Sequence, residues 1–347
     1  MAALVLHDFH QTVGASFTEV NGQEAVAHYD DWRAEYAALR EGAGILDLSF
    51  RGRLCLLGAD RQRFLNGQVT NNVKDLQTGG GCYAALVSAK GKLQSDLNIY
   101  RLENELLLDF EPGYVEIVTQ RLEKYVIAED VQIIDVAPRY GLLSVQGPKS
   151  AEILEKHPKS AMEILKIASP FLGEIYVANR PRLRGPGFDL FVPTAAMTEM
   201  AAQLVSRSGR LCGWRAFETA RIEAGIPRFG VDMDETNLAP EALDASAISY
   251  SKGCYIGQEV IARVRTYGQV AKSLRRLKLE GQEPPPKGAK LFLGDKEVGY
   301  ITSAVQSPAS DSVMSLGYIR READKPGAEL LAETSTGKLP AKIVEPA

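Results

Sequence analysis

The chain of 347 residues is poor in cysteine, histidine and tryptophan, and it has no long apolar run. Its four cysteines, Cys55, Cys82, Cys212 and Cys254, lie far apart, without the short spacing of a zinc cage or a thioredoxin-like motif. We therefore expect free thiols and no self-contained metal site. No segment is long and apolar enough to cross a bilayer, and the N-terminal stretch lacks a basic signal-like region. A cytoplasmic protein without a membrane partner is expected.

The charge balance gives no large excess of either sign. Forty Lys and Arg residues stand against 44 Asp and Glu residues, a formal net charge of −4. A protein that binds nucleic acid mainly by neutralising phosphates would be basic, so direct nucleic-acid binding is not expected. The composition, 45% hydrophobic and 24% charged, is typical of a globular protein, and the length predicts two or three domains.

Strand-like runs and helical stretches alternate without a regular βαβ period, which predicts an α+β fold. One helix is predicted to begin at the cap residue Asp60 and to stop at Gly67, and another to be capped by Thr194. A third is predicted after Gly113, with Val118 and Leu122 on its apolar face.

The last quarter of the chain changes character. Short strands separated by glycine and polar turns predict a separate small antiparallel barrel or sandwich, and the proline triplet at 284–286 is its expected boundary.

A predicted helix ends abruptly in "RIEAGIP", where Gly225 suits a left-handed cap and Pro227 forbids continuation. Glu223 then lies in the last turn, where the helix dipole disfavours a carboxylate. Such a group can accept two parallel hydrogen bonds from a ligand edge like that of a pterin or guanine. Alternatively, it is a surface carboxylate paired with Arg221 or Arg228, and spacing alone favours this second interpretation.

Asp96 lies between a turn at Gly91 and an apolar strand. Partial burial there would raise the pKa of its carboxyl group and suit it to proton transfer or to stabilising a developing cation. An aspartate beside a strand is commonly only a turn or edge residue, and spacing alone favours that interpretation.

The segment 252–259 reads Lys-Gly-Cys-Tyr-Ile-Gly-Gln-Glu. Glycines on both sides of Cys254 predict a turn with positive backbone dihedrals or close backbone approach. Lys252 and more distant arginines could lower the pKa of the thiol and activate it. The alternative is that Cys254 packs as a small hydrophobe while Gln258 and Glu259 satisfy loop amides.

Together these stretches resemble the folate-binding T-protein superfamily, and within it the YgfZ-type branch associated with maturation of iron–sulfur proteins. The segment 252–259 matches the branch signature completely, and "GILDLSFRGRLCLLGADRQRFLNGQVTNNV", "KGKLQSDLNIYRL" and "RIEAGIPRFGVDMDETNLAPEAL" agree in order. The resemblance spans roughly Ile45 to Arg320. Phe50 and Arg51 replace a His-hydrophobic pair usual in T-proteins, and Ser95 replaces the first aspartate of their doublet before Asp96.

The resemblance implies a ring of two interleaved α+β domains, 1–275, followed by a β-barrel-like domain, 276–347. It implies tetrahydrofolate, or a one-carbon-substituted folate, as cofactor. Cys254 and Asp96 are the expected catalytic groups, with Glu223 matching the carboxylate that holds the pterin edge. The expected cofactor-binding residues are Glu223, Arg221, Lys252, Gly253, Tyr255, Gly257, Gln258 and Glu259.

The leading hypothesis is an accessory protein for iron–sulfur cluster assembly or repair. Its expected partners are assembly proteins or cluster-containing clients such as radical tRNA-modifying enzymes. Cys254 would be the reactive group. One alternative is a folate-dependent aminomethyltransferase or demethylase using Asp96. Another is a folate-responsive interaction module without chemistry.

Overall fold

The computed structural model describes residues 3–268, 270–325, 327–335 and 337–344, which form two compact units. The first comprises Met1–Leu86, Ser95–Phe217 and Ser246–Tyr255. The second comprises Val87–Gln94, Glu218–Ala245 and Ile256–Ala347. Both units draw on segments far apart in the sequence, and the division expected after residue 275 stays a prediction.

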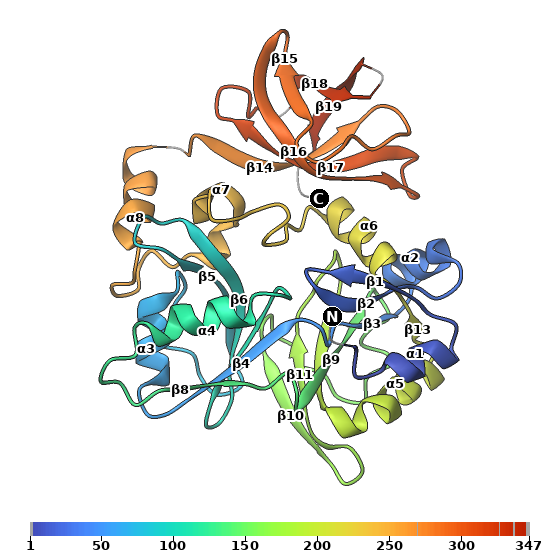
Figure 1. The fold of residues 1–347 in the computed structure, drawn as a ribbon, viewed down its shortest axis with the longest axis vertical. Coiled ribbons are helices and arrows are strands. Elements are labelled where there is room, and N and C mark those ends of the chain that lie inside the picture. Colours follow the sequence, from blue (N-terminus) through green and yellow to red (C-terminus); the bar gives the residue numbers. More distant parts are fainter. Residues whose placement is uncertain (1–2, 269, 326, 336, 345–347) are drawn as a thin grey trace. The chain divides into compact units, whose positions relative to one another are not determined.

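The first unit contains most of the helices and two large sheets (Figure 1). Its helices are α1 (His7–Thr12), α2 (Trp32–Glu41), α3 (Arg61–Gln68), α4 (Val115–Glu123) and α5 (Met197–Ser206). Its strands are β1 (Ser16–Val20), β2 (Gln23–His28), β3 (Gly44–Asp47), β4 (Gly52–Leu57), β5 (Gly81–Val87), β6 (Leu93–Arg101), β7 (Leu106–Phe110), β8 (Gln132–Asp135), β9 (Tyr140–Gln146), β10 (Ile164–Ser169), β11 (Gly173–Asn179), β12 (Gly187–Pro193) and β13 (Arg210–Leu211). The last residue of β5 and the first two of β6 belong to the second unit.

The two large sheets are interleaved along the chain. One has the strand order β10-β11-β12-β9-β3-β13 and the other β5-β6-β7-β4-β8, so β3 precedes the second sheet in sequence while β9 to β13 follow it. The described pairs are antiparallel except β13 with β3. The α+β prediction is confirmed.

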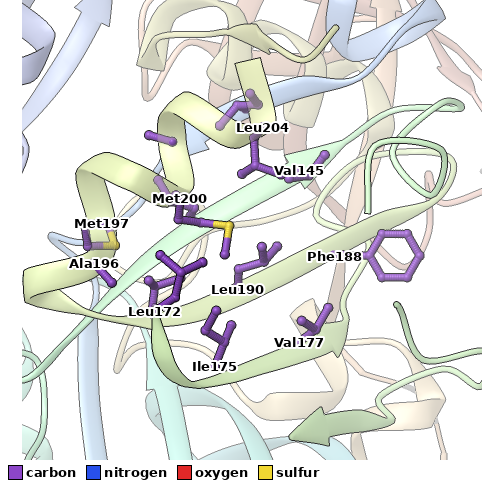
Figure 2. Close-up of a cluster of buried hydrophobic side chains, with 14 of the residues drawn as sticks. Val145, Leu172, Ile175, Val177, Phe188, Leu190, Ala196, Met197, Met200 and Leu204 are labelled. Atoms are coloured by element: carbon purple, nitrogen blue, oxygen red, sulfur yellow. The ribbon is translucent and has the colours of Figure 1, made fainter. Parts of the chain in front are cut away.

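Each large sheet buries one apolar face under helices. Met197, Met200 and Leu204 of α5 pack on Val145 and Leu190 of the first sheet, as Figure 2 shows. The second sheet, with the order β5-β6-β7-β4-β8, buries leucine, isoleucine and phenylalanine side chains of β4, β6 and β7 under α3 and α4. Packing of their apolar faces on the sheets stabilises these helices more than end capping does, because burial of apolar area contributes more free energy than a cap hydrogen bond.

The predicted helix after Gly113 is confirmed, with Val118 and Leu122 buried. The predicted helix start at Asp60 is confirmed, because Asp60 is the N-cap residue of α3. Other details of the predicted helices were wrong. Gly67 lies inside α3, which continues to Gln68, and the side chain of Asp60 makes no cap hydrogen bond. Thr194 begins a 3₁₀ turn (Thr194–Ala196), and its side chain does not cap α5. In both places tertiary packing outweighs a local capping signal.

The second unit contains a closed antiparallel barrel with the order β14-β17-β16-β15-β18-β19, which confirms the predicted small barrel. Its strands are β14 (Lys272–Leu279), β15 (Lys290–Leu293), β16 (Lys296–Ser307), β17 (Ser312–Arg320), β18 (Glu329–Thr334) and β19 (Gly337–Val344). The prolines at 284–286 lie between β14 and β15, inside the barrel, so they are not its boundary. The basic residues of "KSLRRLKL" obscured β14 in the sequence.

The remaining helices lie between Trp214 and Tyr267 in the sequence. They are α6 (Trp214–Ala224), which runs from the first unit into the second, α7 (Ala239–Ala242), the 3₁₀ turn Ala245–Ala247, and α8 (Gln258–Tyr267). None of the described helices combines the length and apolarity that a bilayer crossing would need.

Candidate functional site

Asp96 is a half-buried carboxylate in the middle of β6. Its Oδ2 accepts a hydrogen bond from the Tyr83 hydroxyl at 2.9 Å. Its Oδ1 is buried and receives no hydrogen bond from any described residue. Burial raises the pKa of Asp96, Glu111 raises it further, and Arg51 and Tyr83 oppose the rise. The raised pKa expected from partial burial is therefore confirmed, and Oδ1 is a buried acceptor to which no described residue donates.

Asp96 belongs to a polar face of the second sheet. In the strand register Asn98 pairs with Asp109 of β7, and Asp109 with Arg53 of β4, so these side chains share one face. The intervening residues point the other way into the apolar core under α3 and α4. One face of this sheet is thus hydrophobic, and the other is polar although it is buried.

Buried ion pairs on this polar face connect the two large sheets. Arg51 donates to Asp109 at 2.8 Å and to Glu111 at 2.6 Å. Arg182, from the segment between β11 and β12, bonds Asp109 at 2.7 Å and Asp189 of β12 at 2.6 Å. Burial alone would raise the pKa of Asp109, but Arg182 and Arg51 hold it well below its usual value. Breaking such a pair would leave a buried charge uncompensated.

Sequence reasoning missed this network. Arg51 differs from the residue usual in T-proteins at its position, and it pairs with both Asp109 and Glu111. The available signal was alternation in or directly beside apolar strands. Polar residues two apart occur at 51 and 53, at 96 and 98, and at 109 and 111. That pattern ordinarily indicates a solvent-facing side.

Lys252 ties the loop of Cys254 to the end of α3. Its ammonium donates to the carbonyl oxygens of Asn66 at 2.5 Å, Val69 at 2.8 Å and Asn71 at 2.6 Å. Burial lowers the pKa of Lys252 to about 8, against the opposing effect of the Cys82 thiol. The ammonium also lies 4.9 Å from the centroid of the Tyr255 ring. Lys252 is therefore a clamp that orders this loop.

Cys254 is exposed, between the buried side chains of Lys252 and Tyr255. The alternative in which it packs as a small hydrophobe is wrong. Cys55 and Cys212 are buried and Cys82 is half-buried. Burial raises the pKa of Cys82 to about 12, against the lowering effect of Lys252. Cys254 is therefore the one of the four cysteines whose residue is exposed to solvent.

Within the second unit, Gly257 precedes α8 with φ +81°, and a Cβ there would lie 2.4 Å from the Ser88 carbonyl oxygen. The expected close approach is confirmed at this glycine. It is wrong at Gly253, where a Cβ would meet nothing within 4 Å and φ is not in the left-handed region. Glu259 is exposed and pairs with Arg263 at 2.9 Å. Gln258 is the first residue of α8.

Glu223 lies in the last turn of α6, which ends at Ala224, and Gly225 follows with φ +79°. The predicted helix end is confirmed. The side chain of Glu223 is half-buried, and its backbone carbonyl accepts a hydrogen bond from Arg276 at 2.8 Å.

Arg221 is buried one turn before this helix end and bonds to protein groups on all sides. It donates to both carboxylate oxygens of Glu218, at 2.8 and 2.9 Å, and pairs with Asp232. Further bonds reach the Ile226 carbonyl and the Ser303 hydroxyl. Burial would lower the pKa of Arg221, but Asp232 and Glu218 raise it. In the structure these bonds hold the end of α6 against the barrel. A contact between Arg221 and a cofactor stays a prediction.

Over the described residues, no cluster of three or more His, Cys, Asp or Glu side chains could hold a metal ion.

Comparison with known proteins identifies the family of both parts of the chain. The family model of the GCVT N-terminal domain matches residues 6–252, and that of the glycine cleavage T-protein C-terminal barrel domain matches residues 272–347. A putative chloroplastic transferase of Arabidopsis thaliana is 28% identical over 327 residues, covering 91% of this chain and 74% of its own length. An aminomethyltransferase of Aquifex aeolicus is 29% identical over 331 residues, covering 94% and 90%.

Among solved structures, the glycine cleavage system aminomethyltransferase T from Bartonella henselae superposes with a TM-score of 0.90. It is 22% identical, and the match covers 99% of this chain and 97% of that one. At 22% identity this similarity shows the fold alone, and any statement about chemistry must come from the residues described above.

Proposed function

Because the chain belongs to the GCVT family of glycine cleavage T-protein domains, we propose that it binds tetrahydrofolate and supports iron–sulfur cluster enzymes, as a member of the YgfZ-type branch. The observation that carries this proposal is the exposed thiol of Cys254 on a loop that Lys252 clamps. Its proposed partners are iron–sulfur assembly proteins or cluster-containing client enzymes, including radical tRNA-modifying enzymes.

The chemistry of Cys254 follows from its isolation. Iron–sulfur clusters normally take several cysteine thiolates, so one thiol cannot hold a cluster alone. The thiol would act together with a partner's cysteines, or it would carry a reversible oxidised or persulfide form. Both roles need a thiol that a partner protein can reach, and Cys254 is exposed while Lys252 and Tyr255 keep its loop in place.

The proposed role of Glu223 is to hold the pterin of the folate. A half-buried carboxylate offers two oxygens in one plane, which suits two parallel donors on a pterin edge. The proposed role of Asp96 is to hold or move a proton, because its pKa is raised and Oδ1 makes no bond to a described residue. Folate, when bound, supplies a carrier for one-carbon units.

The experiment is complementation of a deletion strain, read as the activity of a cluster-containing enzyme. Cys254→Ser should abolish rescue, because serine removes the nucleophilic sulfur and changes little else at an exposed position. Cys82→Ser is the matched control, since it makes the same change at a half-buried thiol, and it should retain rescue. Full rescue by Cys254→Ser would refute the proposed role of the thiol.

The second candidate is a folate-dependent aminomethyltransferase or demethylase. The raised pKa of the half-buried Asp96 favours it, as do the relatives named aminomethyltransferase. Here Asp96→Asn should abolish rescue while Cys254→Ser retains it, whereas the first proposal requires Cys254→Ser to abolish it. If both variants rescue fully, the third possibility, an interaction module without chemistry, gains support.

A further inference from the structure

Three alternate residues of β6 each carry a buried polar atom without a hydrogen bond to any described residue. These atoms are Oδ1 of Asp96, Oδ1 of Asn98 and the hydroxyl of Tyr100. Residues two apart in a strand point to the same face, so the three atoms line one side of β6, the polar side between the two large sheets. Asn98 is 2% exposed and Tyr100 0% exposed, so bulk solvent does not reach them.

Asn98 and Tyr100 contact neighbouring residues through other atoms of the same side chains. The amide nitrogen of Asn98 donates to Asp109 at 2.8 Å, which leaves its oxygen as the free acceptor. The ring of Tyr100 packs edge-on against Phe191 at a centroid distance of 6.0 Å, and burial, together with Asp189, raises the pKa of its hydroxyl. Tyr100 therefore remains a neutral hydroxyl that can both donate and accept.

A buried polar atom without a partner is costly, and one strand rarely carries three of them in a row. Same-face residues of a strand are about 6.6 Å apart, and two hydrogen bonds of about 2.8 Å through one water span about 5.6 Å. One or two waters per interval can therefore join successive atoms.

We propose that this face of β6 binds a file of ordered water molecules that joins Asp96, Asn98 and Tyr100. The site takes water because it offers two acceptors and one hydroxyl at water-bridging intervals, inside a face already lined by charged groups. The file hydrates the inner oxygen of Asp96 from within the protein. Its functional meaning rests on the proposed role of Asp96 in proton transfer, but its existence does not.

The test uses Tyr100→Phe, which removes only the hydroxyl at the inner end of the file. If that hydroxyl is bonded to water, the variant loses the bond and its Tm falls by about 2 °C. If the hydroxyl has no partner, its removal relieves a buried polar group and the Tm rises. Tyr140→Phe is the control, because Tyr140 is only partly buried, and its Tm should stay within about 1 °C of wild type.

Two results together support the water file. The Tm falls in Tyr100→Phe and not in the control, and a crystal structure of the full chain at about 1.5 Å resolution shows ordered waters within about 3.2 Å of the three polar atoms. A rise in the Tm of Tyr100→Phe, an equal fall in the control, or a crystal structure without those waters overturns it. Neither measurement uses folate, so the result stands whether or not the proposed function is correct.

Discussion

Replacing Lys252 with methionine removes the three hydrogen bonds that hold the Cys254 loop and keeps the apolar stem. At about 1 kcal/mol net for each bond, the loss is about 3 kcal/mol. The cost of burying the ammonium, which lowers its pKa to about 8, offsets part of this loss. We therefore expect a net destabilisation of about 2 kcal/mol, roughly a 30-fold change in the folding equilibrium.

The pH dependence of this loss has a definite sign. Because the folded-state pKa of Lys252 lies below the ordinary value of 10.5, the unfolded chain binds more protons between pH 8 and 10.5. Wild-type stability should rise with pH across that window relative to Lys252→Met. The free energy of unfolding, measured in urea by circular dichroism at pH 7 and pH 9.5, should thus show a larger difference at pH 9.5. A difference below about 0.5 kcal/mol would contradict the stabilising role of the three hydrogen bonds, and a difference that narrows with pH would contradict the lowered pKa of Lys252.

Three further changes test other parts of the structure. One thiol per native chain should react rapidly with a disulfide reagent, and Cys254→Ser should abolish that reaction; two rapid thiols would contradict the burial of the others. Asp96→Asn should be more stable than wild type at pH 7 and equally stable near pH 3. The reason is that the raised folded-state pKa of Asp96 makes wild-type stability fall as pH rises. A difference in unfolding free energy between the two proteins that stays constant from pH 3 to pH 7 would contradict the raised pKa. Gly257→Ala should cost about 2 kcal/mol in urea unfolding, from φ +81° and contact with the Ser88 carbonyl, and a neutral result would contradict that backbone conformation.

Much of the fold could be predicted because local signals and packing agree. The α6 end at Gly225 and the stripe of Val118 and Leu122 depend on chain geometry alone. Prediction failed where tertiary contacts decide. Gly67 stays helical because α3 packs on its sheet through the neighbouring residues Phe64 and Leu65. Strand β14 was hidden because its basic side chains alternate with apolar ones that fill the barrel core.

The candidate site was only partly predictable. Asp96 and Cys254 were found from their local setting, and the structure gives Asp96 a raised pKa and Cys254 an exposed position. The buried charges were not found, because Arg51, Asp109 and Arg182 come from three segments that only the folded chain brings together. No local pattern distinguishes a polar strand face that meets another sheet from one that meets water.

The most direct test of the central claim is a calorimetric titration of the full chain with tetrahydrofolate. Wild type should show saturable binding at one site per chain. Glu223→Ala should lose it, whereas Glu174→Ala, which removes an exposed glutamate paired with Lys166, should keep it. The absence of binding to the wild type, or unchanged affinity in Glu223→Ala, would contradict the account.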